Sequence, residues 1–114
     1  MRQIVIDDLT QEECANIDNY LKRNTKLAGI DGMFWLRLSD DLLGEAQQGH
    51  HACGPFYFAL ELHKAAGRER LSCEFLVRSE TNLHCSCISY ATAMQRDFLL
   101  RFLDRMLAEE QIRA

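Results

Sequence analysis

The pattern of hydrophobic and polar positions changes its period several times along the chain, and each period predicts a different element. Gln3–Ile6 is a short β-like run that two aspartates end. Thr10 then stands three residues before Glu13, the spacing of a capping box. A helix is therefore predicted over residues 11–23, and its narrow apolar side is typical of a helix that lies on the surface of a sheet.

The middle of the chain predicts one buried strand and one short helix. Residues 32–38 are aromatic or aliphatic for much of their length, as in a strand that is buried on both faces. Ser39 or Asp40 can cap a short helix over residues 41–48, which Gly49 would end. A new extended segment follows Gly54-Pro55, because proline fixes φ and disfavours helix in the residue before it.

Three strands in a meander are predicted after this proline, over residues 56–63, 71–79 and 83–90. Their connections, residues 64–70 and 80–82, have the lengths that hairpins use. Period-two alternation assigns one side chain in two to a common core face. That face consists of Phe56, Phe58, Leu60, Leu62, Leu71, Cys73, Phe75, Val77, Leu83, Cys85, Cys87 and Ser89. Three cysteines are thus expected to point inward.

The last segment, residues 92 to about 112, has the clearest helical period. Thr92 and Gln95 have the capping-box spacing. Leu100 and Leu107 widen the apolar stripe to well over half of the circumference, whereas a helix packed on one sheet needs an arc of only about 100°. The surplus apolar surface predicts a contact with a second chain, so we expect a homodimer through this C-terminal helix.

Together these elements predict a single α+β domain over residues 1–114. We expect a mostly antiparallel sheet with a three-stranded C-terminal meander, packed by an N-terminal helix, a short middle helix and a long C-terminal helix. A chain of 114 residues with 47% hydrophobic and 26% charged residues has the size and composition of one globular domain with its own core.

Charge and composition restrict the partners and the compartment. A net charge of −4 without a basic cluster gives no general attraction to phosphate backbones, so no nucleic-acid partner is expected. The chain has no apolar run of about 18 residues, and its first residues lack the apolar core of a secretory signal, so we expect no membrane association and a cytoplasmic location. Five cysteines cannot all pair internally, and a reducing compartment would keep them as thiols.

All four histidines and four of the five cysteines lie between His50 and Cys87. His50 and Cys53 are three apart, like residues on one turn, and Cys85 and Cys87 are two apart, so on a strand they point the same way. Because Zn²⁺ accepts mixed Cys and His tetrahedra, these four residues are candidate metal ligands, with Cys73 as an alternate. The alternative interpretation is that Cys73, Cys85 and Cys87 fill small spaces in the core, the commonest role of free cysteine.

Thiol chemistry is a second alternative for the same region. Cys53 follows His50 and His51 and precedes a Gly-Pro turn, and an imidazole could deprotonate the thiol. No oxyanion hole or third orienting group can be identified, and the short signatures of common enzyme families are absent. No catalytic and no cofactor-binding residue is therefore predicted.

The sequence favours a small non-enzymatic cytoplasmic interaction or regulatory module that self-associates and contacts a protein partner. The alternative is a Zn²⁺-binding or thiol-based protein that uses the cluster from His50 to Cys87.

Overall fold

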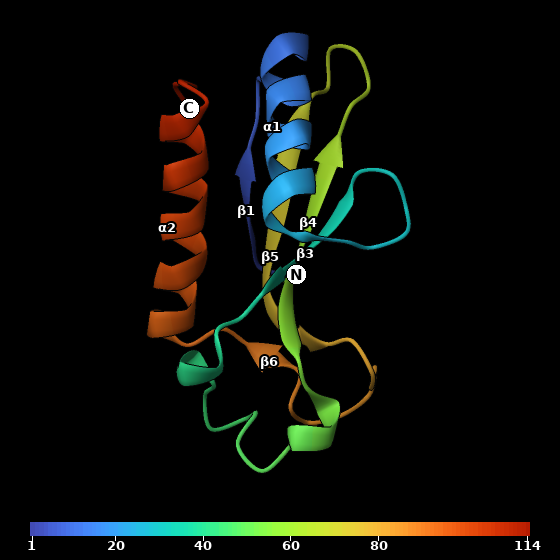
Figure 1. Ribbon diagram of the computed structural model, residues 1–114, viewed down its shortest axis with the longest axis vertical. Helices are drawn as coiled ribbons and strands as arrows, with labels where there is room; N and C mark the ends of the chain where they lie inside the picture. The colour runs from blue at the N-terminus through green and yellow to red at the C-terminus, as the bar shows by residue number, and fades with distance from the viewer.

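The computed structural model describes all residues 1–114 and has an α+β fold, as predicted (Figure 1). Its two α-helices are α1 (Gln11–Asn24) and α2 (Ala93–Glu109). Its strands are β1 (Gln3–Ile6), β2 (Lys26–Leu27), β3 (Met33–Arg37), β4 (Phe56–His63), β5 (Arg70–Ser79) and β6 (Ser89–Tyr90). They form one antiparallel six-stranded sheet in the order β1-β5-β4-β3-β2, with β6 paired to β5.

Both α-helices begin at the predicted capping boxes. Oγ1 of Thr10 accepts from the backbone N–H of Glu13 at 3.0 Å, and the Glu13 carboxylate accepts from the Thr10 N–H at 2.9 Å. Thr92 and Gln95 make the same reciprocal pair at the start of α2, at 3.2 and 2.9 Å. These bonds satisfy backbone donors that have no partner inside a helix. Neither helix has the length and apolar character that crossing a membrane requires.

The core lies between the sheet and the two helices, which run side by side over one face (Figure 1). The rings of Tyr20 on α1 and Phe102 on α2 meet edge to face, with centroids 6.0 Å apart. The side chains that are almost completely buried come from both layers: Ile17, Leu21, Phe34, Phe58, Leu60, Leu71, Val77, Leu99 and Met106. Burial of these apolar groups is the main source of stability of such a domain.

The predicted short middle helix over residues 41–48 is wrong. Residues 40–53 instead form two separate 3₁₀ turns, Asp40–Leu42 and His51–Cys53, with hydrogen-bonded turns between them. A helix of eight residues gains little by itself, and Gly44 in its interior weakens it further. Gln47 instead holds the segment with two side-chain bonds: its Oε1 accepts from the N–H of Gly44 at 2.9 Å, and its Nε2 donates to the distant carbonyl of Cys87 at 2.8 Å.

The predicted third strand of the meander, residues 83–90, is wrong except for its last two residues, β6. Oγ of Ser79 accepts from the N–H of Thr81 and of Asn82, which turns the chain away from β5. Oδ1 of Asn82 then accepts from the N–H of His84, a local bond that asparagine favours in turns. Leu83, expected in the core, is 73% exposed. The meander thus consists of β4, β5 and a two-residue strand.

The predicted core face is correct for β4 and for most of β5. Phe58 pairs with Val77 but Leu60 pairs with Cys73, so residues 74–76 of β5 bulge opposite a single residue of β4. A bulge breaks strict alternation. Cys73 and Val77 are therefore fully buried, whereas Phe75, also predicted for the core, is only half-buried and packs against its margin.

Candidate metal centre

Two loops lie side by side at one end of the sheet, at the bottom of Figure 1, and carry the candidate ligands. In the first loop, residues 38–55, the carbonyl of His50 accepts from the N–H of Cys53 at 3.0 Å, so both residues lie on one turn as predicted. In the second loop, residues 80–88, the carbonyl of Cys85 accepts from the N–H of Ile88 at 3.1 Å. Cys85 and Cys87 thus lie on a turn, not on the predicted strand.

His50, Cys53, Cys85 and Cys87 converge, and we call these four residues the tetrad. One ligand atom from each lies within 4.8 Å of the other three. Nδ1 of His50 and Sγ of Cys85 are 3.2 Å apart, within hydrogen-bond distance. A tetrahedral Zn²⁺ with bonds of about 2.0 to 2.3 Å holds its ligand atoms about 3.5 to 3.8 Å apart. A shift of about 1 Å or less would therefore bring the tetrad to that geometry.

Hydrogen bonds from the end of β5 and from the second loop hold Cys53 in place. Oγ of Ser79 donates to the Cys53 carbonyl, and Oγ1 of Thr81 donates to the same oxygen at 3.3 Å. Nδ2 of Asn82 donates to Sγ of Cys53 at 3.9 Å. Hydrogen bonds to a residue that coordinates a metal fix the orientation of that residue. The first loop is thus bound to the second independently of any ion.

Two buried amides fix the other side of the site. Gln47 and Gln95 are 3% and 1% exposed. Nε2 of Gln47 donates to the Cys87 carbonyl at 2.8 Å, and Nε2 of Gln95 donates to Oε1 of Gln47 at 3.1 Å and to the carbonyl of Leu42 at 2.9 Å. Because Gln95 belongs to the first turn of α2, this chain of bonds connects the helix to the loop that carries Cys87.

The thiols of the second loop differ in acidity. The backbone N–H of Cys87, followed by the Cys87 thiol and with smaller contributions from Cys53 and His50, lowers the pKa of Cys85 to about 7. Burial raises the pKa of Cys87 to about 12, so this thiol stays protonated near neutral pH. A divalent cation reverses the second effect, because a thiol that coordinates it is deprotonated outright. Cys85 is thus the thiol most ready to bind first.

The remaining histidines and cysteines lie outside the tetrad. His51 and His84 are exposed, and His63 is half-buried on β4. Cys73, predicted as an alternate ligand, is fully buried on β5 opposite Ile4 and Leu60, and burial raises its pKa to about 12. The structure therefore does not bring Cys73 to the site. Cys73 fills a space in the core, as the alternative interpretation of the sequence predicted.

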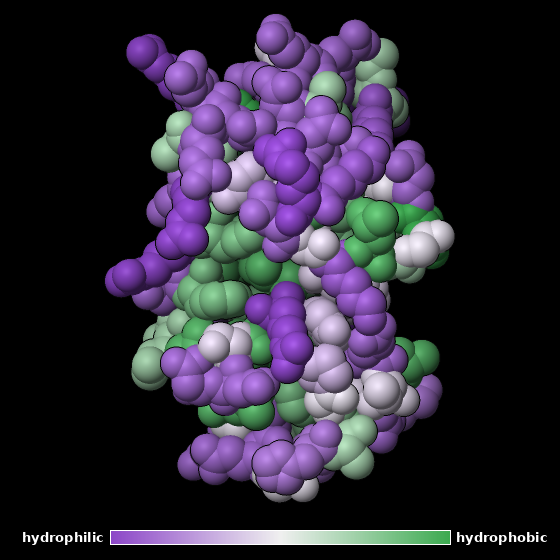
Figure 2. Space-filling view, in the orientation of Figure 1, coloured by the Kyte–Doolittle hydropathy of each residue, from purple (hydrophilic) through white to green (hydrophobic).

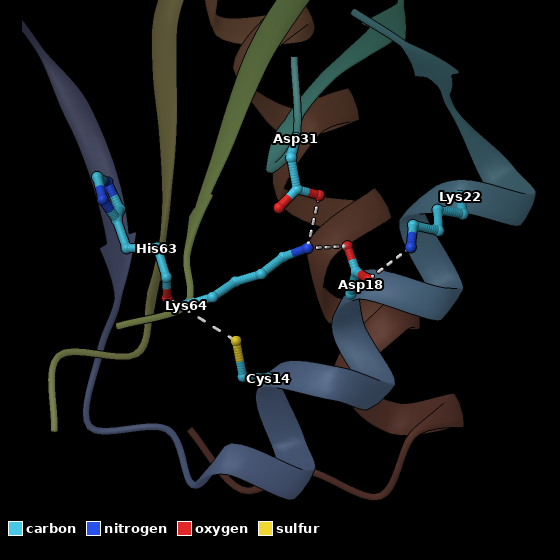
Figure 3. A network of polar contacts seen from close by, with 6 residues as sticks. All are labelled: Cys14, Asp18, Lys22, Asp31, His63 and Lys64. Carbon is cyan, nitrogen blue, oxygen red and sulfur yellow. Dashed lines mark hydrogen bonds and ion pairs between the residues drawn. The ribbon is translucent and has the colours of Figure 1, made fainter. Parts of the chain in front are cut away.

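A second polar cluster, far from the tetrad along the chain, was not expected from the sequence (Figure 3). Nζ of Lys64 lies 3.0 Å from Oδ1 of both Asp18 and Asp31, and Nζ of Lys22 lies 2.9 Å from Oδ2 of Asp18. Burial would raise the pKa of Asp18, but the hydrogen bonds from Lys22 and Lys64 outweigh it and hold this pKa below its ordinary value. Only the helical spacing of Asp18 and Lys22 could have indicated the cluster. It joins α1 to the end of β4.

No protein-family model, curated protein or solved structure matches this chain. The chemistry of the site therefore follows from its own residues: three thiols and one imidazole, supplied by two loops that hydrogen bonds already hold together.

Proposed function

We propose that this chain is a zinc-binding protein that holds one Zn²⁺ through the tetrad of His50, Cys53, Cys85 and Cys87. The observation that supports this most is the convergence of the four ligand atoms within 4.8 Å, from two loops that β4 and β5 separate in sequence. Cysteines that only fill a core need no imidazole nitrogen beside them, whereas His50 lies against Cys85. A set of three cysteines and one histidine is a standard structural zinc site.

The donor set favours zinc over other biological cations. Sulfur ligands exclude Mg²⁺ and Ca²⁺, which take oxygen ligands, and favour Zn²⁺, Cu(I) or iron–sulfur clusters. Of these three, Zn²⁺ is the one that typically takes a tetrahedron of three thiolates and one imidazole. Four protein ligands leave no position for water or substrate, so the proposed role is structural rather than catalytic. The ion would cross-link two loops that contain little regular secondary structure.

Metal analysis of protein purified without an affinity tag or chelator tests this proposal. We expect about one zinc per chain in the wild type, and its loss in both His50→Ala and Cys87→Ser. His51→Ala and Cys73→Ala are the matched controls, because they change the same residue types outside the tetrad and should keep the metal. A wild type that is metal-free as purified and takes up neither Zn²⁺ nor Co²⁺ on reconstitution would exclude a zinc site.

A structural ion is compatible with a second candidate function, that of a non-enzymatic interaction or regulatory module. The observation in its favour is apolar surface along α2. Figure 2 shows hydrophobic residues exposed among polar ones on the face in view. On α2, Met94, which is 70% exposed, and Phe98 line a shallow hollow with Leu42. Leu100 and Leu107, which the sequence assigned to a dimer contact, are half-buried in the isolated chain. Measuring self-association tests this second candidate.

A further inference from the structure

Strand β1 forms one edge of the sheet, because it pairs only with β5. The carbonyl of Arg2 accepts from the N–H of Phe75 at 3.1 Å, so the backbone groups of Arg2 are directed toward β5. Backbone direction alternates along an antiparallel strand, so Ile4 and Ile6 also face β5, whereas Gln3 and Val5 direct their N–H and C=O groups outward. An edge with unpaired backbone groups is a template for a further strand.

An apolar groove lies directly beside this edge. It has a volume of about 300 Å³, and most of its lining is apolar: Ile4, Val5 and Ile6 of β1, Leu100, Leu103 and Leu107 of α2, and Ala114. Asp7 and Asp104 complete the lining. Val5 is 40% exposed, and Leu100 and Leu107 are half-buried. Free backbone hydrogen-bonding groups and incompletely buried apolar side chains thus occur together along one side of the molecule.

We propose that the partner at this edge is a second copy of this chain, with the two β1 strands paired antiparallel about a two-fold axis at Val5. Residues that exchange hydrogen bonds across such a pair must direct their backbone groups toward each other and their side chains to the same face. Pairing Val5 with the partner's Val5 meets both conditions. It also places Ile4 opposite the partner's Ile6 and Gln3 opposite the partner's Asp7.

The charges at the ends of β1 fit this register. Arg2 precedes β1 at one end, where its guanidinium lies over the Tyr90 ring, and Asp7 and Asp8 follow β1 at the other end, so the two-fold axis brings the basic end of each strand near the acidic end of its partner. No two like charges stand opposite each other, which is the condition for a cross-strand pair to be stable. The β1 edge is therefore complementary to the same edge of a second copy, as a two-fold interface requires.

The same axis brings the two α2 helices together. Leu100 and Leu107 lie two turns apart on the groove side of α2. Antiparallel helices related by an axis near Val5 would place Leu100 opposite the partner's Leu107, which covers the groove with apolar side chains from both copies. The surplus apolar surface of α2 then has a defined partner, and the two sheets become continuous.

Sedimentation equilibrium of the intact chain, with variants of β1, tests the proposal. We expect a dimer at tens of micromolar. Val5→Asp should weaken it about tenfold or more, because two carboxylates would face each other at the axis. Val5→Thr, which keeps the β-branched shape without charge, is the control and should remain dimeric. Leu100→Glu with Leu107→Glu should give a monomer, whereas Met94→Glu, at an exposed position outside the groove, should not.

Hydrogen exchange on the wild type provides a second test, and its result does not depend on whether any variant folds. The Val5 amide has no partner in the isolated chain and gains one only in the dimer, so its protection should rise with protein concentration. A wild type that is monomeric at hundreds of micromolar would overturn the proposal. A dimer that tolerates Val5→Asp and leaves the Val5 amide unprotected would also overturn it, because the interface would then lie elsewhere.

Discussion

Nε2 of Gln95 lies 3.1 Å from Oε1 of Gln47, and through this bond the first turn of α2 is joined to the loop that carries Cys87. Both amides are buried, and both are hydrogen-bonded to backbone groups as well as to each other. A buried network in which every member is satisfied stabilises one arrangement, whereas the same network with one member removed is costly. The position of the second loop is thus linked to the start of the long helix.

Gln47→Leu should show this link. The substitution leaves a donor of Gln95 and the Cys87 carbonyl without their partner, so we expect the free energy of unfolding to fall by about 1 to 3 kcal/mol. If the tetrad binds Zn²⁺, its affinity should fall about 10- to 100-fold, as happens when outer contacts of metal ligands are lost. Urea unfolding and competition with a chelator measure the two effects. Gln48→Leu, one residue away and exposed, should change neither.

Phe34→Ala and Phe75→Ala should differ in their effects on stability. Phe34 is 1% exposed in the core, so its truncation should cost about 3 to 5 kcal/mol. Phe75 lies in the bulge of β5 and is half-buried, so the same change should cost clearly less. Urea unfolding of the two variants gives the comparison. Equal losses would mean that Phe75 lies in the core and that β5 continues without a bulge.

This difference illustrates what the sequence can and cannot predict. The two α-helices were predictable because each depends on neighbours three residues apart, Thr10 with Glu13 and Thr92 with Gln95. Residues 41–48 and 83–88 were not, because contacts with distant residues determine their conformation, above all the bond between Gln47 and Cys87. The bulge at residues 74–76 could not be predicted either, because Phe75 keeps its spacing of two from Cys73 and from Val77.

The sequence named the four residues that converge in the structure, although one half of their geometry was not foreseen. Spacing alone placed His50 and Cys53 on one turn, and the structure confirms this. Cys85 and Cys87 were expected to point inward from a strand, whereas they lie on a turn and still approach the first pair. The support from Ser79 and Gln47 could not be predicted, because nothing near either residue in sequence indicates its partner.

Asp18→Asn should reduce stability in a pH-dependent way. Hydrogen bonds from Lys22 and Lys64 hold the pKa of Asp18 below its ordinary value of 3.8, so the carboxylate stabilises the folded state above that pH. This contribution is lost as the pH falls through the lower pKa of the folded state. We expect Asn at this position to cost about 1 kcal/mol at neutral pH, and the difference to shrink below about pH 4. Asp97→Asn, in an exposed ion pair with Arg101, is the control and should change little at any pH.

Cys85 should be the most reactive thiol of the metal-free protein. The Cys87 backbone N–H lowers its pKa to about 7, and the side chain is half-buried, so a large fraction is an accessible thiolate near neutral pH. Burial raises the pKa of Cys73 to about 12, and this thiol should remain unmodified while the fold is intact. Brief alkylation followed by peptide mass spectrometry should therefore label Cys85 well before Cys73. Prior addition of Zn²⁺ should protect Cys85 in the wild type but not in His50→Ala. Labelling of Cys85 that Zn²⁺ leaves unchanged would show that Cys85 does not hold the ion, and the proposed site would have to be abandoned.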